Sequence, residues 1–286
     1  MESENQTYLR KPQWLRTRLT GAGEYGQMKS RIQPGGLHTI CESGACPNKG
    51  ECWGSGTATF MILGDICTRS CRFCNVQTGK PQAPDISEPE KLASAVASMK
   101  VKHCVITSVD RDDLPDGGAS HWAECIEAIK IFSPETTIEA LIPDFKGKHE
   151  DILKVVRSGP EVISHNLETV RRLTPEVRVH ASYERSLDVL DKIGKHSSIR
   201  TKSGIMLGLG ETGGEIIETM DDLLAVGCKV MTIGQYLQPS RKSLPVKKYI
   251  EPTDFERYGR IAREKGFLYV ESAPLVRSSY HADKHV

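Results

Sequence analysis

The segment TATFMILGDICTRSCRFC, residues 57–74, joins a β-like run to three closely spaced cysteines. Residues 57–63 are predicted to form a buried strand, and Cys67, Cys71 and Cys74 follow it on one short loop. In parallel βα folds the carboxyl ends of the strands carry the active site. The segment therefore predicts a βα fold with a metal site at that edge of its sheet.

Short β-like runs alternate with helix-length amphipathic segments from residue 57 onward, which predicts parallel βα units in either a doubly wound sheet or a barrel. Polar clusters after several strands favour the barrel. The expected strands are residues 57–63, 103–107, 137–141, 162–164, 199–207, 229–233 and 268–271, and the expected helices are residues 89–99, 119–132, 150–157, 183–193, 214–225 and 254–264. Six repeats predict an α/β fold, a partial (β/α)6 TIM-type barrel over residues 56–271. Residues 1–55 and 272–286 are expected to be N-terminal and C-terminal extensions over the barrel mouth.

Length and charge exclude several classes of protein. The chain has 286 residues and a formal net charge of +1, so no overall positive charge points to nucleic acid. No apolar run reaches the length of a membrane span, and the N-terminus lacks the apolar core of a secretory signal. We therefore expect a cytoplasmic protein with neither a membrane nor a nucleic acid as partner.

Six of the nine cysteines form two triplets. Cys41, Cys46 and Cys52 precede the first strand, while Cys104, Cys125 and Cys228 stand apart and are expected to be buried core thiols. Each triplet is one thiolate short of the four ligands of a closed zinc or iron–sulfur site. The alternative for the second triplet is a zinc knuckle, but no Cys-x2-Cys partner pair follows it. Each metal centre is therefore expected to take its fourth ligand from elsewhere.

The pattern Cys-x3-Cys-x-aromatic-Cys, with Phe73 in the aromatic position, resembles the signature of the radical S-adenosylmethionine (SAM) superfamily. The resemblance implies that Cys67, Cys71 and Cys74 hold a [4Fe–4S] cluster whose fourth iron is chelated by SAM. An electron from that cluster cleaves SAM and releases a 5′-deoxyadenosyl radical. The cofactors then perform the chemistry, and the protein supplies ligation and orientation.

Three motifs in order resemble the lipoyl synthase family: the first triplet, the SAM-type triplet and RSSY at residues 277–280. The resemblance also covers TSVDRDD (107–113), GIMLGLGET (204–212) and GQYLQPS (234–240). It implies that Cys41, Cys46 and Cys52 hold an auxiliary [4Fe–4S] cluster with Ser279 as the fourth ligand, and with Ser278 as the second choice. An oxygen ligand is a poorer match than thiolate for iron in a sulfide cluster, so this corner is expected to open.

The activity implied by this resemblance is that of a sulfurtransferase of lipoate biosynthesis. Two sulfur atoms enter C6 and C8 of an octanoyl chain attached to a lysine of a carrier domain, and two SAM molecules and the auxiliary cluster are consumed. Unactivated C–H bonds have no acidic proton, so radical abstraction with tight positioning is the remaining route. The alternatives are a radical SAM enzyme whose auxiliary cluster is not sacrificed, and a non-catalytic iron–sulfur or zinc protein.

Polar residues at strand ends are the candidates for holding SAM. By resemblance to the superfamily they are Asn75, Thr107, Ser108, Glu139, Asn166 and Arg178, with ordinary loop-capping roles as the alternative. Arg178 could meet the SAM carboxylate as a bidentate fork. By contrast, Glu168, Arg171 and Arg172 are expected to be helix-face charges.

The same resemblance implies the partners. The substrate is an octanoylated lipoyl carrier domain, from either a 2-oxoacid dehydrogenase E2 component or the glycine cleavage H protein. The enzyme also needs an electron donor such as ferredoxin or flavodoxin, and a carrier that repairs the cluster. Basic residues at 241–242 and 247–248 form either a solvated face or a docking site for an acidic carrier domain.

Overall fold

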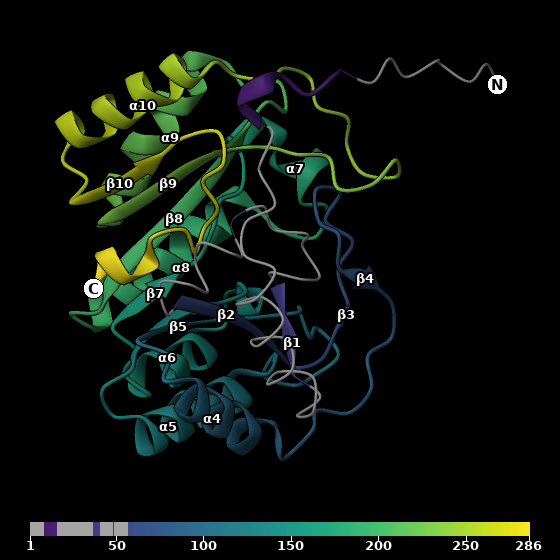
Figure 1. Cartoon of the computed structure of the whole chain (residues 1–286), viewed down its shortest axis with the longest axis vertical. Coiled ribbons are helices and arrows are strands. Elements are labelled where there is room, and N and C mark those ends of the chain that lie inside the picture. The colour runs from purple at the N-terminus through teal and green to yellow at the C-terminus, as the bar shows by residue number, and fades with distance from the viewer. Residues whose placement is uncertain (1–8, 16–36, 41–47, 49–56) are drawn as a thin grey trace.

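Seven parallel strands form the framework of the computed structural model, which describes residues 9–15, 37–40, 48 and 57–286 (Figure 1). The sheet order follows the chain: β2 (Thr57–Ile62), β5 (His103–Ser108), β6 (Thr137–Leu141), β7 (Val162–Ser164), β8 (Arg200–Leu207), β9 (Val230–Gln235) and β10 (Tyr269–Ser272). A short strand, β1 (His38–Thr39), pairs antiparallel with β2 at one edge. In the described residues β1 and β10 end this order, so the sheet is open, and the predicted α/β fold is confirmed.

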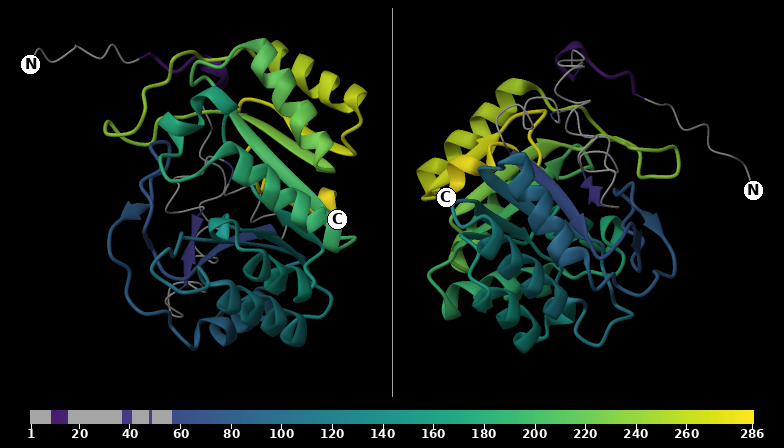
Figure 2. Two further views of the ribbon diagram at one scale, coloured as in Figure 1. Left: turned by 180° about the vertical axis from the view of Figure 1, so that it is seen from behind. Right: turned by 60° about the horizontal axis from the view of Figure 1, so that its bottom comes forward.

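Helices connect consecutive strands, as right-handed βα crossovers require. They are α4 (Glu88–Met99), α5 (Ala119–Phe132), α6 (His149–Arg157), α7 (Thr174–Val177), α8 (Tyr183–His196), α9 (Gly213–Ala225) and α10 (Pro252–Lys265). Figure 2 shows from behind that the helices lie over the outer face of the strands. Local signals set their ends: Thr212 and Glu215 form a reciprocal capping box on α9, and Gly266 ends α10 with φ 114°.

Apolar side chains fill the space between strands and helices in two clusters. One packs β2, β5 and β6 against α4, α5 and α6, and the other packs β8 and β9 against α9 and α10. All six side chains of β2 are buried, as in a strand covered on both faces. Cys104, Cys125 and Cys228 are free thiols buried in these clusters, which confirms their predicted place in the core.

The inner face of the sheet is more polar. Lys202 Nζ donates to Glu139 Oε2 at 2.8 Å, and both side chains are fully buried. The C-terminal segment (yellow in Figure 1) crosses this face and ends in a short 3-10 helix, η5 (Ala282–His285). The Arg200 guanidinium, at the start of β8, donates to the His285 carbonyl oxygen. The two ends of the sheet thus differ: the last residues of the tail lie at the amino end of β8, and the carboxyl ends of the strands face the cysteine loop.

None of the helices in the described part of the chain combines the length and hydrophobicity that crossing a bilayer requires.

Candidate functional site

Three free, half-buried thiols lie on the loop that follows β2. Cys67 ends β3 (Ile66–Cys67), which pairs with β4 (Gln77–Thr78) and folds the intervening residues into a compact turn. Within that turn the Cys74 N–H donates to the Cys71 carbonyl oxygen at 3.1 Å. All three cysteines line the same cavity, as ligands of one cluster must.

Backbone N–H groups point at two of the sulfur atoms. Cys67 Sγ accepts from the N–H groups of Arg69 at 3.4 Å and Asp110 at 3.3 Å, and Cys74 Sγ accepts from Val76 at 3.4 Å. Burial, with the Asp110 carboxylate as a second cause, raises the pKa of Cys67 to about 11 and that of Cys71 to about 12; burial also raises the pKa of Cys74. Buried thiolates need a nearby cation, and the irons of a cluster supply that charge. Among the described residues no three His, Cys, Asp or Glu side chains are grouped to hold a single metal ion, whereas in a [4Fe–4S] cluster each thiolate binds a different iron.

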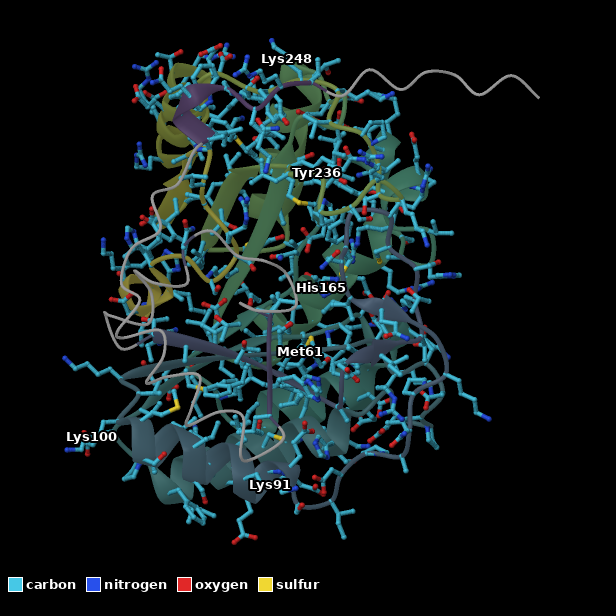
Figure 3. All side chains as sticks on the ribbon, turned by 45° about the vertical axis from the view of Figure 1, so that its right-hand side comes forward. Met61, Lys91, Lys100, His165, Tyr236 and Lys248 are labelled. Carbon is cyan, nitrogen blue, oxygen red and sulfur yellow. The ribbon has the colours of Figure 1, made fainter. Side chains whose placement is uncertain are left out.

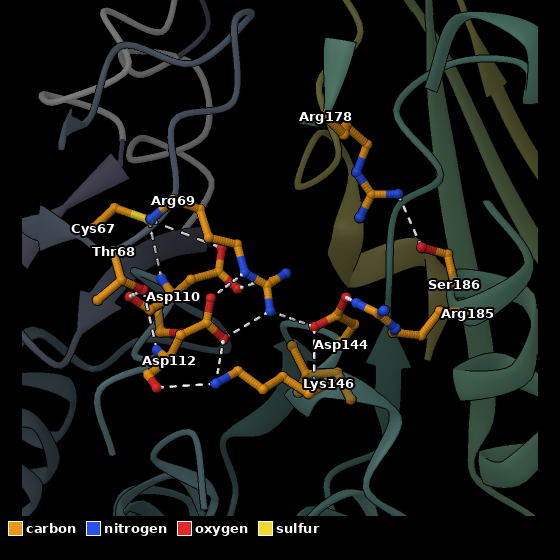
Figure 4. Close-up of polar contacts among 12 residues, drawn as sticks. Cys67, Thr68, Arg69, Asp110, Asp112, Asp144, Lys146, Arg178, Arg185 and Ser186 are labelled. Atoms are coloured by element: carbon orange, nitrogen blue, oxygen red, sulfur yellow. Dashed lines mark hydrogen bonds and ion pairs between the residues drawn. The ribbon is translucent and has the colours of Figure 1, made fainter. Parts of the chain in front are cut away.

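Arg69 joins this loop to the ends of two strands (Figure 4). Its guanidinium binds Asp112 in a bidentate pair at 2.7 and 2.9 Å, Asp144 at 2.6 Å and Asp110 at 3.3 Å. Asp110 and Asp112 follow β5, and Asp144 follows β6. The bond from Arg69 lowers the pKa of Asp112, whereas burial raises the pKa of Asp110. Arg69 is 6% exposed, and it fixes the cysteine loop against the sheet.

The cavity has a volume of about 330 Å³ and opens at the carboxyl ends of the parallel strands. Apolar side chains form much of its wall: Met61, Val76, Leu141, Ile142, Ile205 and Met206. It is in the size range of small-molecule sites, which combine apolar walls with a few placed polar groups. Such a wall can hold an aliphatic chain and exclude water from a reacting centre.

Most of the predicted site residues in the described region meet at this cavity. Its lining includes Cys67, Cys71, Phe73, Cys74, Thr107, Ser108, Asn166 and Arg178. Arg178 is 7% exposed, and its Nη1 donates to the Leu167 carbonyl oxygen at 3.3 Å and to Ser186 Oγ at 2.9 Å. The Asn166 amide nitrogen donates to Glu168, while its buried Oδ1 has no partner among the described residues.

Two of the residues predicted to hold SAM lie apart from the cavity wall. Asn75 is exposed on the loop after Cys74. Glu139 is fully buried beneath the cavity, where its carboxylate accepts from Lys202 at 2.8 Å and from Ser164 Oγ at 2.9 Å. Their assignment as SAM contacts stays a prediction.

The prediction that Glu168 is a helix-face charge is wrong. It lies between β7 and α7 with φ 65°, in the left-handed region that non-glycine residues rarely adopt. Its backbone N–H donates to Gly204 and its carbonyl oxygen accepts from Met206, so β8 holds this conformation. The side chain lines the cavity, and burial raises its pKa. Arg171 and Arg172 are surface residues, as expected, and they pair with carboxylates there.

The end of the chain reaches the same cavity. Val276, Arg277 and Ser278 line it, whereas Ser279 is not among the lining residues. Cys41, Cys46 and Cys52 lie outside the described residues. Between them in the sequence, Asn48 is described, and its side-chain amide donates to the Leu275 carbonyl oxygen at 2.6 Å. Position 48 is thereby joined to the C-terminal segment.

Comparisons with known proteins agree with this geometry. The profile of the radical SAM superfamily matches residues 61–223. A lipoyl synthase of Bacteroides fragilis is 57% identical over 99% of this chain and 98% of its own length, and a mitochondrial lipoyl synthase of Nematostella vectensis is 56% identical over 96% and 95%. Both relatives match almost end to end.

Solved structures share the fold at low sequence identity. The FeFe-hydrogenase maturase HydG of Carboxydothermus hydrogenoformans aligns over 92% of this chain and 77% of its own, with a TM-score of 0.58 and 15% identity. Streptococcus suis SuiB bound to its precursor peptide aligns over 93% and 57%, with a TM-score of 0.59 and 10% identity.

Proposed function

The chain belongs to the lipoyl synthase family within the radical SAM superfamily, and on that premise we propose how its residues insert sulfur into a protein-bound octanoyl chain. The products are new C–S bonds at C6 and C8 of an octanoyl-lysine. The proposal rests on one observation. Cys67, Cys71 and Cys74 line the same cavity as Ser278, which is about 200 residues away in the sequence, near the end of the chain.

Cys67, Cys71 and Cys74 would hold the radical-generating [4Fe–4S] cluster. When bound, this cluster supplies the electron that cleaves SAM into methionine and the 5′-deoxyadenosyl radical that removes hydrogen from the substrate. The protein keeps the ligands in place through the bonds of Arg69 to the strand ends and through N–H groups directed at Cys67 and Cys74. Such N–H bonds to sulfur help to set the reduction potential of a cluster.

Asn166, Glu168 and Arg178 would orient SAM. They line the same cavity as the three cysteines, on the segments that follow β7. Oδ1 of Asn166, which has no partner within the residues that the structure describes, and the Glu168 carboxylate can accept bonds from hydroxyl or ammonium groups. Arg178 can pair with a carboxylate, and Thr107 and Ser108 offer further polar contacts from the end of β5.

We place the sulfur-donating auxiliary cluster at Cys41, Cys46 and Cys52, with Ser279 as its fourth ligand. The bond from Asn48 to Leu275 supports this assignment because it joins a residue between those cysteines to the segment that carries RSSY. Ser278 in the cavity wall brings that segment to the radical site. When bound, this cluster would supply both sulfur atoms, and an oxygen ligand offers a corner that can open.

The substrate would be an octanoylated carrier domain, whose lysine arm enters the apolar part of the cavity. An electron donor of the ferredoxin or flavodoxin kind and a cluster-repair carrier would complete the cycle.

A single-turnover assay tests this function. After anaerobic reconstitution we expect roughly eight irons per chain, no stoichiometric zinc, and SAM cleavage under dithionite. With octanoylated carrier and no added sulfide, each lipoyl group formed should consume one cluster. Retention of both clusters after product formation would overturn the sacrificial role, and a zinc-loaded protein without SAM cleavage would overturn the enzymatic one.

A further inference from the structure

The loop between β9 and α10 concentrates positive charge. Of its 16 residues, 236–251, four are cationic and exposed, and the single acidic residue is Glu251, which is exposed at the N-cap of α10. Lys242, Lys247 and Lys248 pair with no carboxylate in the described part of the chain. The Tyr249 hydroxyl donates to the Leu9 carbonyl oxygen at 3.4 Å, which brings the exposed residues Arg10 and Lys11 to the same loop. We call this surface the basic rim; it comprises Arg10, Lys11, Arg241, Lys242, Lys247 and Lys248.

The backbone of this loop is fixed by bonds to buried groups. The Gln235 side chain, at the end of β9, accepts from the Ile250 N–H at 2.8 Å and donates to the Lys248 carbonyl oxygen at 3.1 Å. The Lys247 N–H donates to the Gly208 carbonyl oxygen at 2.8 Å. A surface that is ordered before binding loses less conformational entropy when a partner docks. The charged side chains of the basic rim are thus attached to a backbone that is already ordered before a partner binds.

The basic rim lies beside the cysteine loop. The Leu244 N–H donates to the Arg72 carbonyl oxygen at 3.0 Å, so the loop contacts the cysteine loop between Cys71 and Phe73. Leu244 itself is buried, and the Tyr236 hydroxyl donates to its carbonyl oxygen at 2.7 Å. A protein bound on the basic rim would therefore sit at the edge of the cavity that its modified side chain must enter.

We propose that the basic rim is the docking surface for the carrier domain, and that the carrier presents an acidic patch around its octanoyl-lysine. The inference rests on the proposed function, which supplies the carrier as substrate. Exposed charges at a rim act mainly by steering encounter and orientation, and salt screens them. The apolar cavity then selects the octanoyl chain, while the rim selects the protein that carries it.

The test compares two charge reversals of equal size. The first is Lys242→Glu/Lys247→Glu/Lys248→Glu in the basic rim. The matched control is Lys100→Glu/Lys102→Glu/Lys229→Glu, whose exposed lysines lie at or beside the amino ends of the strands. Figure 3 shows Lys248 and Lys100 at opposite ends of the molecule. Each reconstituted enzyme is assayed for the Kd of octanoylated carrier and for single-turnover lipoylation of the carrier and of a short octanoyl-lysyl peptide.

We expect the rim variant to bind the carrier roughly tenfold more weakly at low salt, with the difference shrinking as salt rises. Its lipoylation of the peptide should match wild type, and the control variant should match wild type on both substrates. Unchanged carrier affinity of the rim variant would overturn the docking proposal, as would equal losses on carrier and peptide. A wild-type enzyme that binds carrier but lipoylates neither substrate would instead overturn the proposed function.

Discussion

Arg69 illustrates what one buried side chain does for the cysteine loop. Its guanidinium is almost fully removed from water, yet it is compensated by three carboxylates that belong to the ends of β5 and β6. Removing one partner of a buried charge network costs far more than the network contributes as a whole, because the remaining charges stay buried and unpaired. The loop that holds Cys67 and Cys71 therefore depends on a residue that binds no metal itself.

We predict that Arg69→Ala destabilises the fold by about 3–5 kcal/mol and lowers the iron bound after reconstitution. Arg69→Lys keeps the charge but loses the bidentate geometry, so it should fall between Ala and wild type. Urea unfolding and iron content measure both effects. Arg72→Ala is the matched control, because Arg72 is half-exposed and pairs with Glu176 at 3.6 Å; the variant should change stability by less than about 1 kcal/mol. Equal effects at positions 69 and 72 would contradict this role.

A second pair of variants separates the adjacent serines of the tail. Ser279→Ala should lose or alter the auxiliary cluster while SAM cleavage continues without lipoyl formation, because the radical site stays intact. Ser278→Ala, in the cavity wall, should keep both clusters. Mössbauer spectra, 5′-deoxyadenosine release and lipoyl yield distinguish them. Unchanged lipoyl formation by the Ser279 variant would count against it as a ligand.

The residues of the site differed in how far the sequence could predict them. Cysteine spacing is a strong signal because ligand geometry restricts it, so the placement of Cys67, Cys71 and Cys74 was predictable. Glu168 was not, because its place in the cavity depends on a left-handed backbone conformation that β8 imposes from a distance. The ion pair of Glu139 with Lys202 likewise joins strands that are far apart in the sequence.

At the scale of elements, the predicted strands and helices match the observed ones to within a few residues. Strand–helix alternation was readable because buried β-branched runs and amphipathic helices have different periods. Small elements were missed: β1, β3 and β4 are two-residue strands whose pairing is set by tertiary contacts. The position of the tail on β9 could not be predicted either, because it depends on the close approach of the Val276 backbone to Gly234.

The close contact between the tail and β9 leads to a prediction for a substitution at Gly234, in β9. A Cβ added there would lie 2.1 Å from the Val276 carbonyl oxygen, so Gly234→Ala must displace the tail. We expect lipoyl formation to fall at least tenfold while SAM cleavage is retained, because the RSSY segment moves and the cysteine loop does not. Gly214→Ala in α9 meets no atom within 4 Å and should be neutral or slightly stabilising. Full lipoyl yield from the Gly234 variant would show that the tail position is not critical.

Across the whole molecule, the last residues tie together strands from both halves of the sheet. His285 is buried, and both of its ring nitrogens lack partners in the described part of the chain. Burial lowers its pKa from 6.5 to about 3, with Lys202, His103 and Arg200 among the positive or basic groups that add to the shift. The docked tail therefore requires the neutral imidazole.

This requirement links stability to pH. Below pH 6.5 the unfolded chain binds a proton at His285 that the folded chain does not, so stability present above pH 6.5 is lost as the pH falls toward 3. The loss from this residue should approach roughly 1.4 kcal/mol per pH unit. His285→Leu fills a similar volume without a titrating group, so urea unfolding at pH 7.5, 6.5 and 5.5 should show a shallower pH dependence for the variant. Parallel pH profiles of the two proteins would mean that His285 is not held neutral by the fold.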